Sequence, residues 1–280
     1  MIEFKQANWV LRGQLLITAI AVIGLLWIAA SAFFKTPFPS ASLNIRTLPA
    51  GCPQMLTGQP GRHNDLMTPG GLRYSVIAPV NYQPNLQYGL LMVYPPAGFS
   101  NTAAERYYQL TTKANKQGFI AVYSTAIPLS EQALRLQREV VPHVMSQWCI
   151  DPHRVVSLGH SDGGSVTTGL TVRQAVTPPP THIVSSAAGI TAEDLKQEAC
   201  PAPLNVTVLH NPKDKLFPDY GAGAVKWWAQ CMQCSVQVET EATGCIRRQC
   251  AREKILRHCA TTEPHSQWPV VTQHLFEWID

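Results

Sequence analysis

The chain has 280 residues, of which 45% are hydrophobic, so it can bury a full core, and one α/β domain after a short leader is the simplest organisation. The formal net charge is only +4 and no long basic run occurs, which argues against a nucleic-acid partner. The 22 prolines are scattered among apolar segments and predict a loop-rich surface rather than disorder.

The N-terminal segment predicts export. Leu15–Phe34 is a run of twenty uncharged residues, preceded by Lys5 and Arg12. Such a run can cross a bilayer as a helix, but Ala30-Ser31-Ala32 also fits the cleavage site of a signal peptide. Both interpretations place the rest of the chain beyond the membrane, because the positive charge lies mainly before the run, with Lys35 after it. A buried core helix is the remaining alternative.

We therefore expect a signal peptide or membrane anchor in residues 1–34, a linker in 35–50 and one folded domain in 51–280. The domain would be secreted, or would lie at the periplasmic or extracellular face of the membrane. If the leader is not cleaved, it would be the contact with the membrane.

Cysteine usage agrees with export. All eight cysteines come after the apolar run, and five of them lie between Cys231 and Cys259. An even number in an oxidising compartment predicts disulfides, whose pairing stays open. One alternative is a zinc site that uses Cys231-x-x-Cys234 with later thiols. A redox C-x-x-C is a further alternative, although no thioredoxin-like strand precedes it.

After an irregular Pro49–Gly71, strands and helices alternate along the chain. The expected strands are Leu72–Pro79, Tyr88–Tyr94, Gly118–Ser124, Arg154–Leu158, Ile183–Ala187 and Leu204–His210. The expected helices are Asn101–Lys116, Glu131–Trp148 with a kink at Pro142, Ser165–Gln174 and Pro269–Ile279, the last with Val270, Val271, His274, Leu275 and Trp278 on one face. This alternation predicts an α/β fold, with a mostly parallel sheet and helices on both faces.

One motif organises the rest of the chain. Gly159-His160-Ser161-Asp162-Gly163 fits G-x-S-x-G and lies between a β-branched strand and a helix. In that context the pattern predicts a nucleophile elbow, a tight strand-to-helix turn that exposes the serine hydroxyl and needs small residues two positions before and after it. The fold would then be an α/β-hydrolase fold. The alternative is a glycine-rich turn that only caps the helix.

A serine at such an elbow needs a base and an orienting carboxylate, in the chain order Ser, Asp, His. Asp214 comes shortly after the expected strand Leu204–His210, so we predict it as the acid, with Asp219 and Asp194 as rivals. His265 lies in a loop directly before the last helix and is the predicted base. His258 lies among basic residues and cysteines, and His274 is expected to pack inward.

Three motifs together resemble an exported esterase family, that of polyhydroxybutyrate depolymerases, feruloyl esterases and acetylxylan esterases. They are the elbow, His210-x-x-x-Asp214 and His265-Ser266-Gln267-Trp268-Pro269. The opening of the domain, with Gly51-Cys52, Leu72-Arg73-Tyr74, Pro79 and Tyr82, is also similar to feruloyl-esterase-like members. The resemblance covers about Gly51 to the C-terminus. It implies that Ser161, Asp214 and His265 are nucleophile, acid and base of an ester hydrolase.

The chain departs from that family in two places. Family members usually carry a His-Gly pair after the early strand, where one amide of the oxyanion hole arises, whereas this chain has Pro95-Pro96-Ala97-Gly98-Phe99. We expect the backbone amides of Asp162 and Phe99 to form the hole. The second departure is the segment from Cys231 to Cys259, which is dense in cysteine and basic. Its charges predict a solvated surface, or attraction of acidic ligands or anionic lipid heads.

We expect His160 and Trp268 to contact the substrate, an ester of a small molecule or of a polymer, with no cofactor and no metal. Trp227 and Trp228 can line a groove too, although tryptophans often pack in cores. The acyl group predicted by the resemblance is of the acetyl, feruloyl or hydroxyalkanoate type. The alternatives are an inactive hydrolase fold that serves as a membrane-tethered binding protein, and a serine peptidase of the same fold.

Overall fold

The computed structural model describes residues 39–43, 48–52 and 56–279, so the predicted leader lies outside the described residues. Within those ranges no helix combines the length and the apolar character that crossing a bilayer requires. Part of the predicted linker is described, and it contacts the domain. The amide of Leu43 donates to Asn81 Oδ1, and Leu48 packs against the core.

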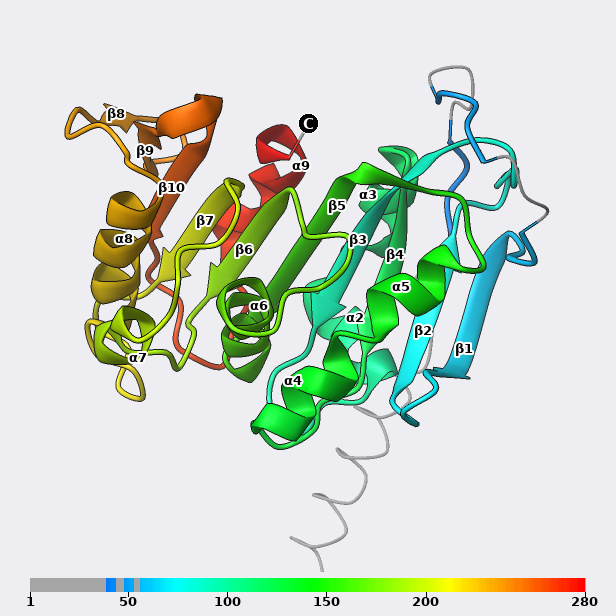
Figure 1. Ribbon diagram of the computed structural model, residues 1–280, viewed down its shortest axis with the longest axis horizontal. Helices are drawn as coiled ribbons and strands as arrows, with labels where there is room; N and C mark the ends of the chain where they lie inside the picture. Colours follow the sequence, from blue (N-terminus) through cyan, green and yellow to red (C-terminus); the bar gives the residue numbers. More distant parts are fainter. Residues whose placement is uncertain (1–38, 44–47, 53–55, 280) are drawn as a thin grey trace, which may run out of the picture. The chain divides into compact units, whose positions relative to one another are not determined.

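Ten strands of the described residues form one sheet, in the order β1-β2-β4-β3-β5-β6-β7-β10-β9-β8 (Figure 1). Their bounds are β1 Gly61–Met67, β2 Arg73–Ala78, β3 Tyr88–Tyr94, β4 Phe119–Ser124, β5 Ile150–His160, β6 His182–Ser186, β7 Asn205–His210, β8 Glu239–Thr240, β9 Ile246–Gln249 and β10 Ile255–Ala260.

The centre of the sheet is parallel and its edges are antiparallel. Strands β4, β3, β5, β6, β7 and β10 run parallel to one another. Strands β2 and β1 add antiparallel at one edge, and β9 and β8 at the other. The sheet is therefore mixed around a parallel centre. Strand β3 is buried along its whole length, as expected for a parallel strand covered on both faces.

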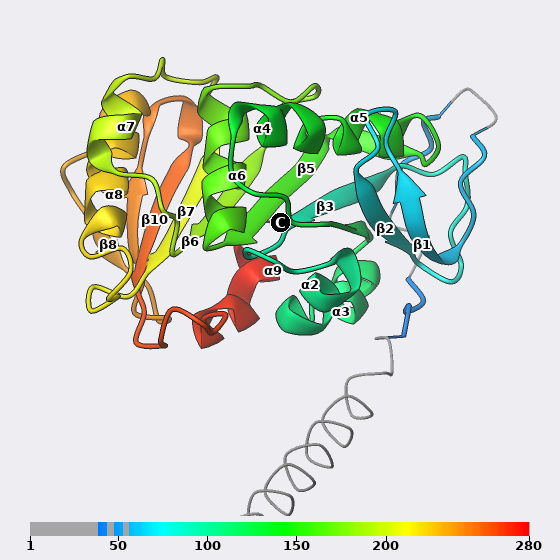
Figure 2. The same ribbon diagram turned by 90° about the horizontal axis from the view of Figure 1, so that it is seen from below.

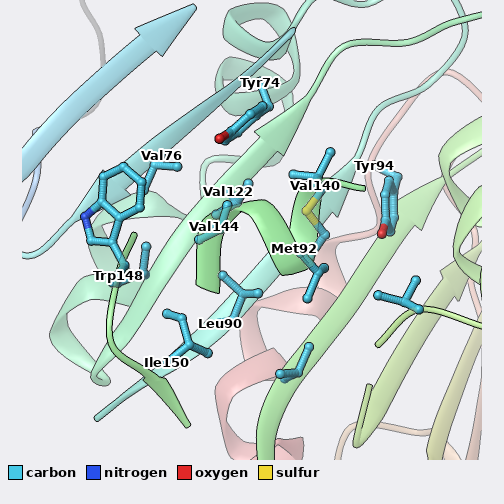
Figure 3. Close-up of a cluster of buried hydrophobic side chains, with 14 of the residues drawn as sticks. Tyr74, Val76, Leu90, Met92, Tyr94, Val122, Val140, Val144, Trp148 and Ile150 are labelled. Carbon is cyan, nitrogen blue, oxygen red and sulfur yellow. The ribbon is translucent and has the colours of Figure 1, made fainter. Parts of the chain in front are cut away.

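Helices cover both faces of the sheet, as predicted (Figure 2). One face carries α4 (Glu131–Gln137), α5 (Val140–Met145), α6 (Asp162–Val172), α7 (Ala192–Lys196) and α8 (Tyr220–Cys231). The other carries α2 (Asn101–Tyr108), α3 (Thr111–Lys116) and α9 (Leu275–Trp278). In the first of these layers, Val140 and Val144 of α5 and Trp148 pack with Leu90 and Met92 of β3 (Figure 3).

Three predicted elements differ from the structure. The segment predicted to be irregular contains β1, a polar edge strand that pairs only with β2. The helix predicted over Asn101–Lys116 is two helices, because Gln109 takes a left-handed conformation with φ 54°. The helix predicted over Glu131–Trp148 is also two, and Pro142 lies in the first turn of the second, where its missing N–H costs no helical hydrogen bond.

The face predicted for the last helix is only partly right: Leu275 is buried, and Val271 and Trp278 pack partly buried against the core. Its first part, Val270–His274, is a 3₁₀ helix, and only the part from Leu275 is α-helical. The tighter turn changes which residues point inward. Val270 is 65% exposed, His274 hydrogen-bonds Glu277 near the surface, and the buried residues are Thr272, Leu275 and Phe276.

All eight cysteines form disulfides in the described part of the chain: Cys52–Cys149, Cys200–Cys231, Cys234–Cys250 and Cys245–Cys259. Cys231 and Cys234 pair with different partners, so they form neither the zinc pair nor the redox pair weighed as alternatives. Two bridges staple the small β8–β10 extension, in which β9 is half-buried and β8 is exposed at the edge of the sheet. Four disulfides are consistent with an extracellular or periplasmic location.

Candidate active site

The turn from β5 into α6 has the geometry of a nucleophile elbow. Ser161 is held at φ 56° and ψ −122°, a conformation that non-glycine residues rarely adopt. A Cβ on Gly159 would collide with the backbone of Gly163, and one on Gly163 would collide with the carbonyl of Tyr94. The small residues predicted at these two positions are therefore required by close backbone contacts.

Three side chains far apart in the sequence meet at this turn. His265 Nε2 lies 2.8 Å from Ser161 Oγ, and His265 Nδ1 lies 2.6 Å from Asp214 Oδ2. The Asp214 side chain is 1% exposed and that of His265 17% exposed. Ser161 comes after β5, Asp214 after β7 and His265 after β10, so the carboxyl ends of three parallel strands bring them together. In this arrangement an imidazole can accept the proton of a serine hydroxyl.

Asp214 is fixed by backbone amides as well as by His265. Its Oδ1 accepts hydrogen bonds from the amides of Leu216 (2.8 Å) and Phe217 (3.3 Å). Burial alone would raise the pKa of Asp214, but the hydrogen bonds from His265 and from these two amides outweigh it and lower the pKa. The group therefore stays a carboxylate at neutral pH.

His160 is buried inside the site. It is 2% exposed, and both ring nitrogens have partners: Nδ1 lies 2.9 Å from Ser186 Oγ and Nε2 lies 2.6 Å from the carbonyl oxygen of His265. Burial lowers the pKa of His160 to about 4, partly offset by the hydrogen bond to the carbonyl oxygen of His265. These contacts leave no ring nitrogen for a substrate, so the geometry favours an internal role over the predicted substrate contact.

Trp268 lies in the loop after His265. Its indole packs edge-on against Tyr108, with ring centroids 4.7 Å apart, and its buried Nε1 has no hydrogen-bond partner among the described residues. The indole also borders a surface groove of about 640 Å³ between this loop and α2–α3. Trp227 and Trp228, by contrast, are buried residues of α8 and pack against each other.

The two amides predicted for an oxyanion hole differ in their surroundings. Asp162 is the first residue of α6, where an amide has no partner within the helix. The Phe99 amide donates to the carbonyl oxygen of Pro96 at 3.2 Å and closes a turn. Pro95 and Pro96 carry no N–H, so Ala97 is the first residue after β3 with an amide to offer.

The rival residues lie elsewhere. Asp219 is exposed at the start of α8, and Asp194 is bound to Thr191 in the capping box of α7. His258 is in β10, and His274 contacts Glu277. Within the residues that the structure describes, no group of three or more His, Cys, Asp or Glu side chains is placed to hold a metal ion.

Sequence reasoning missed three residues that contact the candidate triad or its turn. Ser186 ends β6 beside His160, and its carbonyl oxygen accepts the Ser161 amide at 2.9 Å. Phe217 packs edge-on against His265, with ring centroids 5.1 Å apart. The Tyr108 hydroxyl accepts the amide of His160 at 2.8 Å. None of them belongs to a motif, because each contact depends on which strands and loops are neighbours.

A second groove, of about 450 Å³, runs along α6 between α4 and α7. Ser165 and Gly189 line it, and Ser165 Oγ donates to the carbonyl oxygen of Ser161 at 3.2 Å. The groove therefore begins one helical turn from the elbow. Its far part is polar, with Arg173 paired to Glu131 and Glu198.

The basic segment near the C-terminus is largely engaged in internal contacts. Arg257 is 6% exposed, pairs with Glu241 and lies over the Trp278 ring. Arg247 pairs with Glu239. Arg248 donates to the carbonyl oxygens of Ser235 and Val236. These arginines hold the β8–β10 extension together.

We expect the protein to lose stability in mild acid. Burial lowers the pKa of His160 to about 4 and that of His182 to about 3, against about 6.5 in an unfolded chain. The unfolded chain therefore binds protons that the native state does not, and the free energy of unfolding falls as the pH drops below about 6.5. The two groups together should account for about 4 kcal/mol between about pH 7.5 and about pH 5.

Urea unfolding at the two pH values measures this loss. His182→Leu should remove about half of the difference, because His182 then no longer titrates. An unfolding free energy that stays constant over this range would contradict the assignment of neutral, buried rings.

The fold is similar to that of solved hydrolases. Acetyl xylan esterase from Aspergillus awamori is 15% identical with a TM-score of 0.59, over 79% of this chain and 99% of that chain. S-formylglutathione hydrolase from Staphylococcus aureus is 12% identical with a TM-score of 0.57, over 78% and 97%. Esterase PE8 is 13% identical with a TM-score of 0.53, over 74% and 96%. The chain therefore has the α/β-hydrolase fold of these proteins. No protein-family model and no curated protein matches the sequence.

Proposed function

We propose that the chain is an exported serine esterase that hydrolyses carboxylic esters through Ser161, His265 and Asp214. The observation that carries this proposal is the pair of contacts made by one imidazole, 2.8 Å to the serine hydroxyl and 2.6 Å to a buried carboxylate. The similarity of the fold to esterases agrees with it. The four disulfides agree with export.

The residue types dictate the chemistry. As Ser161 Oγ attacks the ester carbonyl carbon, His265 Nε2 takes the hydroxyl proton, and the carbonyl π pair moves onto oxygen. When the tetrahedral intermediate collapses, the bond to the alcohol oxygen breaks and His265 returns the proton to that oxygen. Water repeats both steps on the acyl-enzyme and releases the acid. Asp214 keeps the Nδ1 proton in place and stabilises the imidazolium.

The oxyanion needs donors that are already in position. The Asp162 amide would be one, with the positive end of α6 behind it. The second would come from the loop between Ala97 and Phe99. The Phe99 amide must give up its bond to Pro96 to take part, whereas the Ala97 amide lies within this turn and does not close it.

The ester is proposed to be of the acetyl, feruloyl or hydroxyalkanoate type, borne by a small molecule or a polymer. A structural neighbour is named for acetyl groups on xylan. The grooves of about 450 Å³ and about 640 Å³ beside the site are large enough for the acyl and alcohol parts of such esters. Trp268 borders the groove of about 640 Å³ and is proposed to contact the substrate there.

The test is a panel of acetyl, feruloyl and hydroxybutyrate esters together with a fluorophosphonate probe. We expect the probe to label the purified protein at Ser161 and at least one ester to be hydrolysed, because only a serine beside a base reacts in this way. A folded protein that the probe does not label would instead be an inactive binding protein. Matching amide substrates distinguish a peptidase, which would cleave them at rates comparable to the esters.

A further inference from the structure

Four residues at the elbow form a closed circuit of hydrogen bonds. The Ser161 amide donates to the carbonyl oxygen of Ser186 at 2.9 Å, and Ser186 Oγ lies 2.9 Å from His160 Nδ1. His160 Nε2 lies 2.6 Å from the carbonyl oxygen of His265. His265 Nε2 returns to Ser161 Oγ at 2.8 Å. The circuit thus joins the backbone of Ser161 to the backbone of His265 through two buried side chains, those of Ser186 and His160.

The chemistry of the partners fixes where the protons lie. A carbonyl oxygen only accepts, so His160 Nε2 must carry a hydrogen and donate it to His265. In a neutral imidazole Nδ1 is then an acceptor, so the Ser186 hydroxyl donates to it. Burial lowers the pKa of His160 to about 4, which keeps the ring neutral near pH 7. Each group in the circuit is therefore assigned either as hydrogen-bond donor or as acceptor, and the assignments agree with one another.

His265 needs such an anchor because its loop has little regular structure. Residues 261–269 form no helix or strand, and one turn is closed there by the bond from the Gln267 amide to the Pro264 carbonyl oxygen at 2.9 Å. Asp214 orients the imidazole of His265, but it holds only the side chain. The bond from His160 holds the backbone of the same residue.

We propose that His160 is a positioning residue. By holding the carbonyl oxygen of His265, it fixes the distance from the His265 imidazole to the Ser161 hydroxyl. This role rests on the esterase function proposed above. His160 is itself fixed, because its amide donates to the Tyr108 hydroxyl and its ring packs among Tyr107, Trp268 and His265. A displacement of about 1 Å at a reacting group can reduce turnover about 100-fold.

His160→Leu should therefore lower kcat on p-nitrophenyl acetate about 100-fold, with KM changed less than about 3-fold. His160→Gln should recover at least about 10-fold of that loss, because the amide nitrogen of glutamine reaches about as far as Nε2 and can donate to the same carbonyl. Ser186→Ala removes only the hydroxyl that fixes the His160 ring and keeps the backbone carbonyl. Its kcat should lie between those of the wild type and His160→Leu. If His160→Leu does not fold, Ser186→Ala serves as the test variant instead.

His182→Leu is the matched control. His182 is also buried, on the same strand as Ser186, but its Nε2 contacts Thr207 and it has no contact with the candidate triad. It should lose stability while keeping kcat within about 2-fold. An equal loss of kcat in His182→Leu, no recovery in His160→Gln, or unchanged kcat in folded His160→Leu would each overturn the positioning role.

The rate of fluorophosphonate labelling is measured on the same variants, because it needs no natural substrate. We expect it to fall in parallel with kcat. A wild-type protein that is not labelled would overturn both the esterase and the positioning role. A labelled wild type whose rate His160→Leu leaves unchanged would overturn the positioning role alone.

Discussion

Ser161→Ala is expected to lower kcat/KM on p-nitrophenyl acetate by at least about 10⁴-fold. The activity that remains would come from substrate binding and from the amides that stabilise the oxyanion. The hydroxyl is the atom that His265 Nε2 contacts, and in the proposed mechanism the acyl-enzyme forms on it. The fold should remain, because alanine tolerates φ 56° about as well as serine and the backbone bond to Ser186 is kept. Activity assays and thermal unfolding of the same sample check both statements.

Ser157→Ala is the control for this variant. Ser157 lies four residues earlier on β5 and is 5% exposed, so its loss tests whether any buried serine beside the turn affects turnover. It should keep activity within about 3-fold. Unchanged turnover in Ser161→Ala, or an equal collapse in Ser157→Ala, would remove Ser161 from the nucleophile position.

The elbow could be predicted because its requirements are local. Gly159 and Gly163 are needed where backbones almost touch, and a buried strand before them and a helix after them leave clear patterns. Asp214 and His265 could be placed because each comes after the end of an element. Their convergence then depends on β5, β7 and β10 running parallel in one sheet, with only β6 between β5 and β7. The structure has both contacts of His265, and the catalytic roles of the three residues stay a prediction.

Other features depend on contacts that no local pattern reveals. Strand β1 has a polar sequence, and it exists because it pairs with the edge of β2. In β10, Arg257 is buried against Glu241, so the strand looks like a solvated segment until that partner is known. The break after α2 falls on Gln109, a residue that gives no sign of a left-handed turn. The His160–Ser186 contact depends on the register of β5 and β6.

Asp214→Asn is expected to lower kcat/KM about 10⁴-fold while preserving the size of the side chain. The amides of Leu216 and Phe217 both donate to Oδ1, so the oxygen of an asparagine would stay there and its NH₂ group would face His265. That group can only donate, and His265 Nδ1 would have to accept. The ring hydrogen would then lie on Nε2, pointing at the Ser161 hydroxyl, and the base could no longer take the serine proton.

Asp219→Asn separates this effect from a general loss of charge in the loop. Asp219 is five residues further along and has the same side chain, but it is exposed and its carboxylate forms no cap on α8. Its variant should keep kcat/KM within about 2-fold. A fall of less than about 10-fold in Asp214→Asn would mean that the imidazole keeps its tautomer without the carboxylate. An equal fall in Asp219→Asn would mean that the loop, rather than the hydrogen bond to His265, controls the reaction.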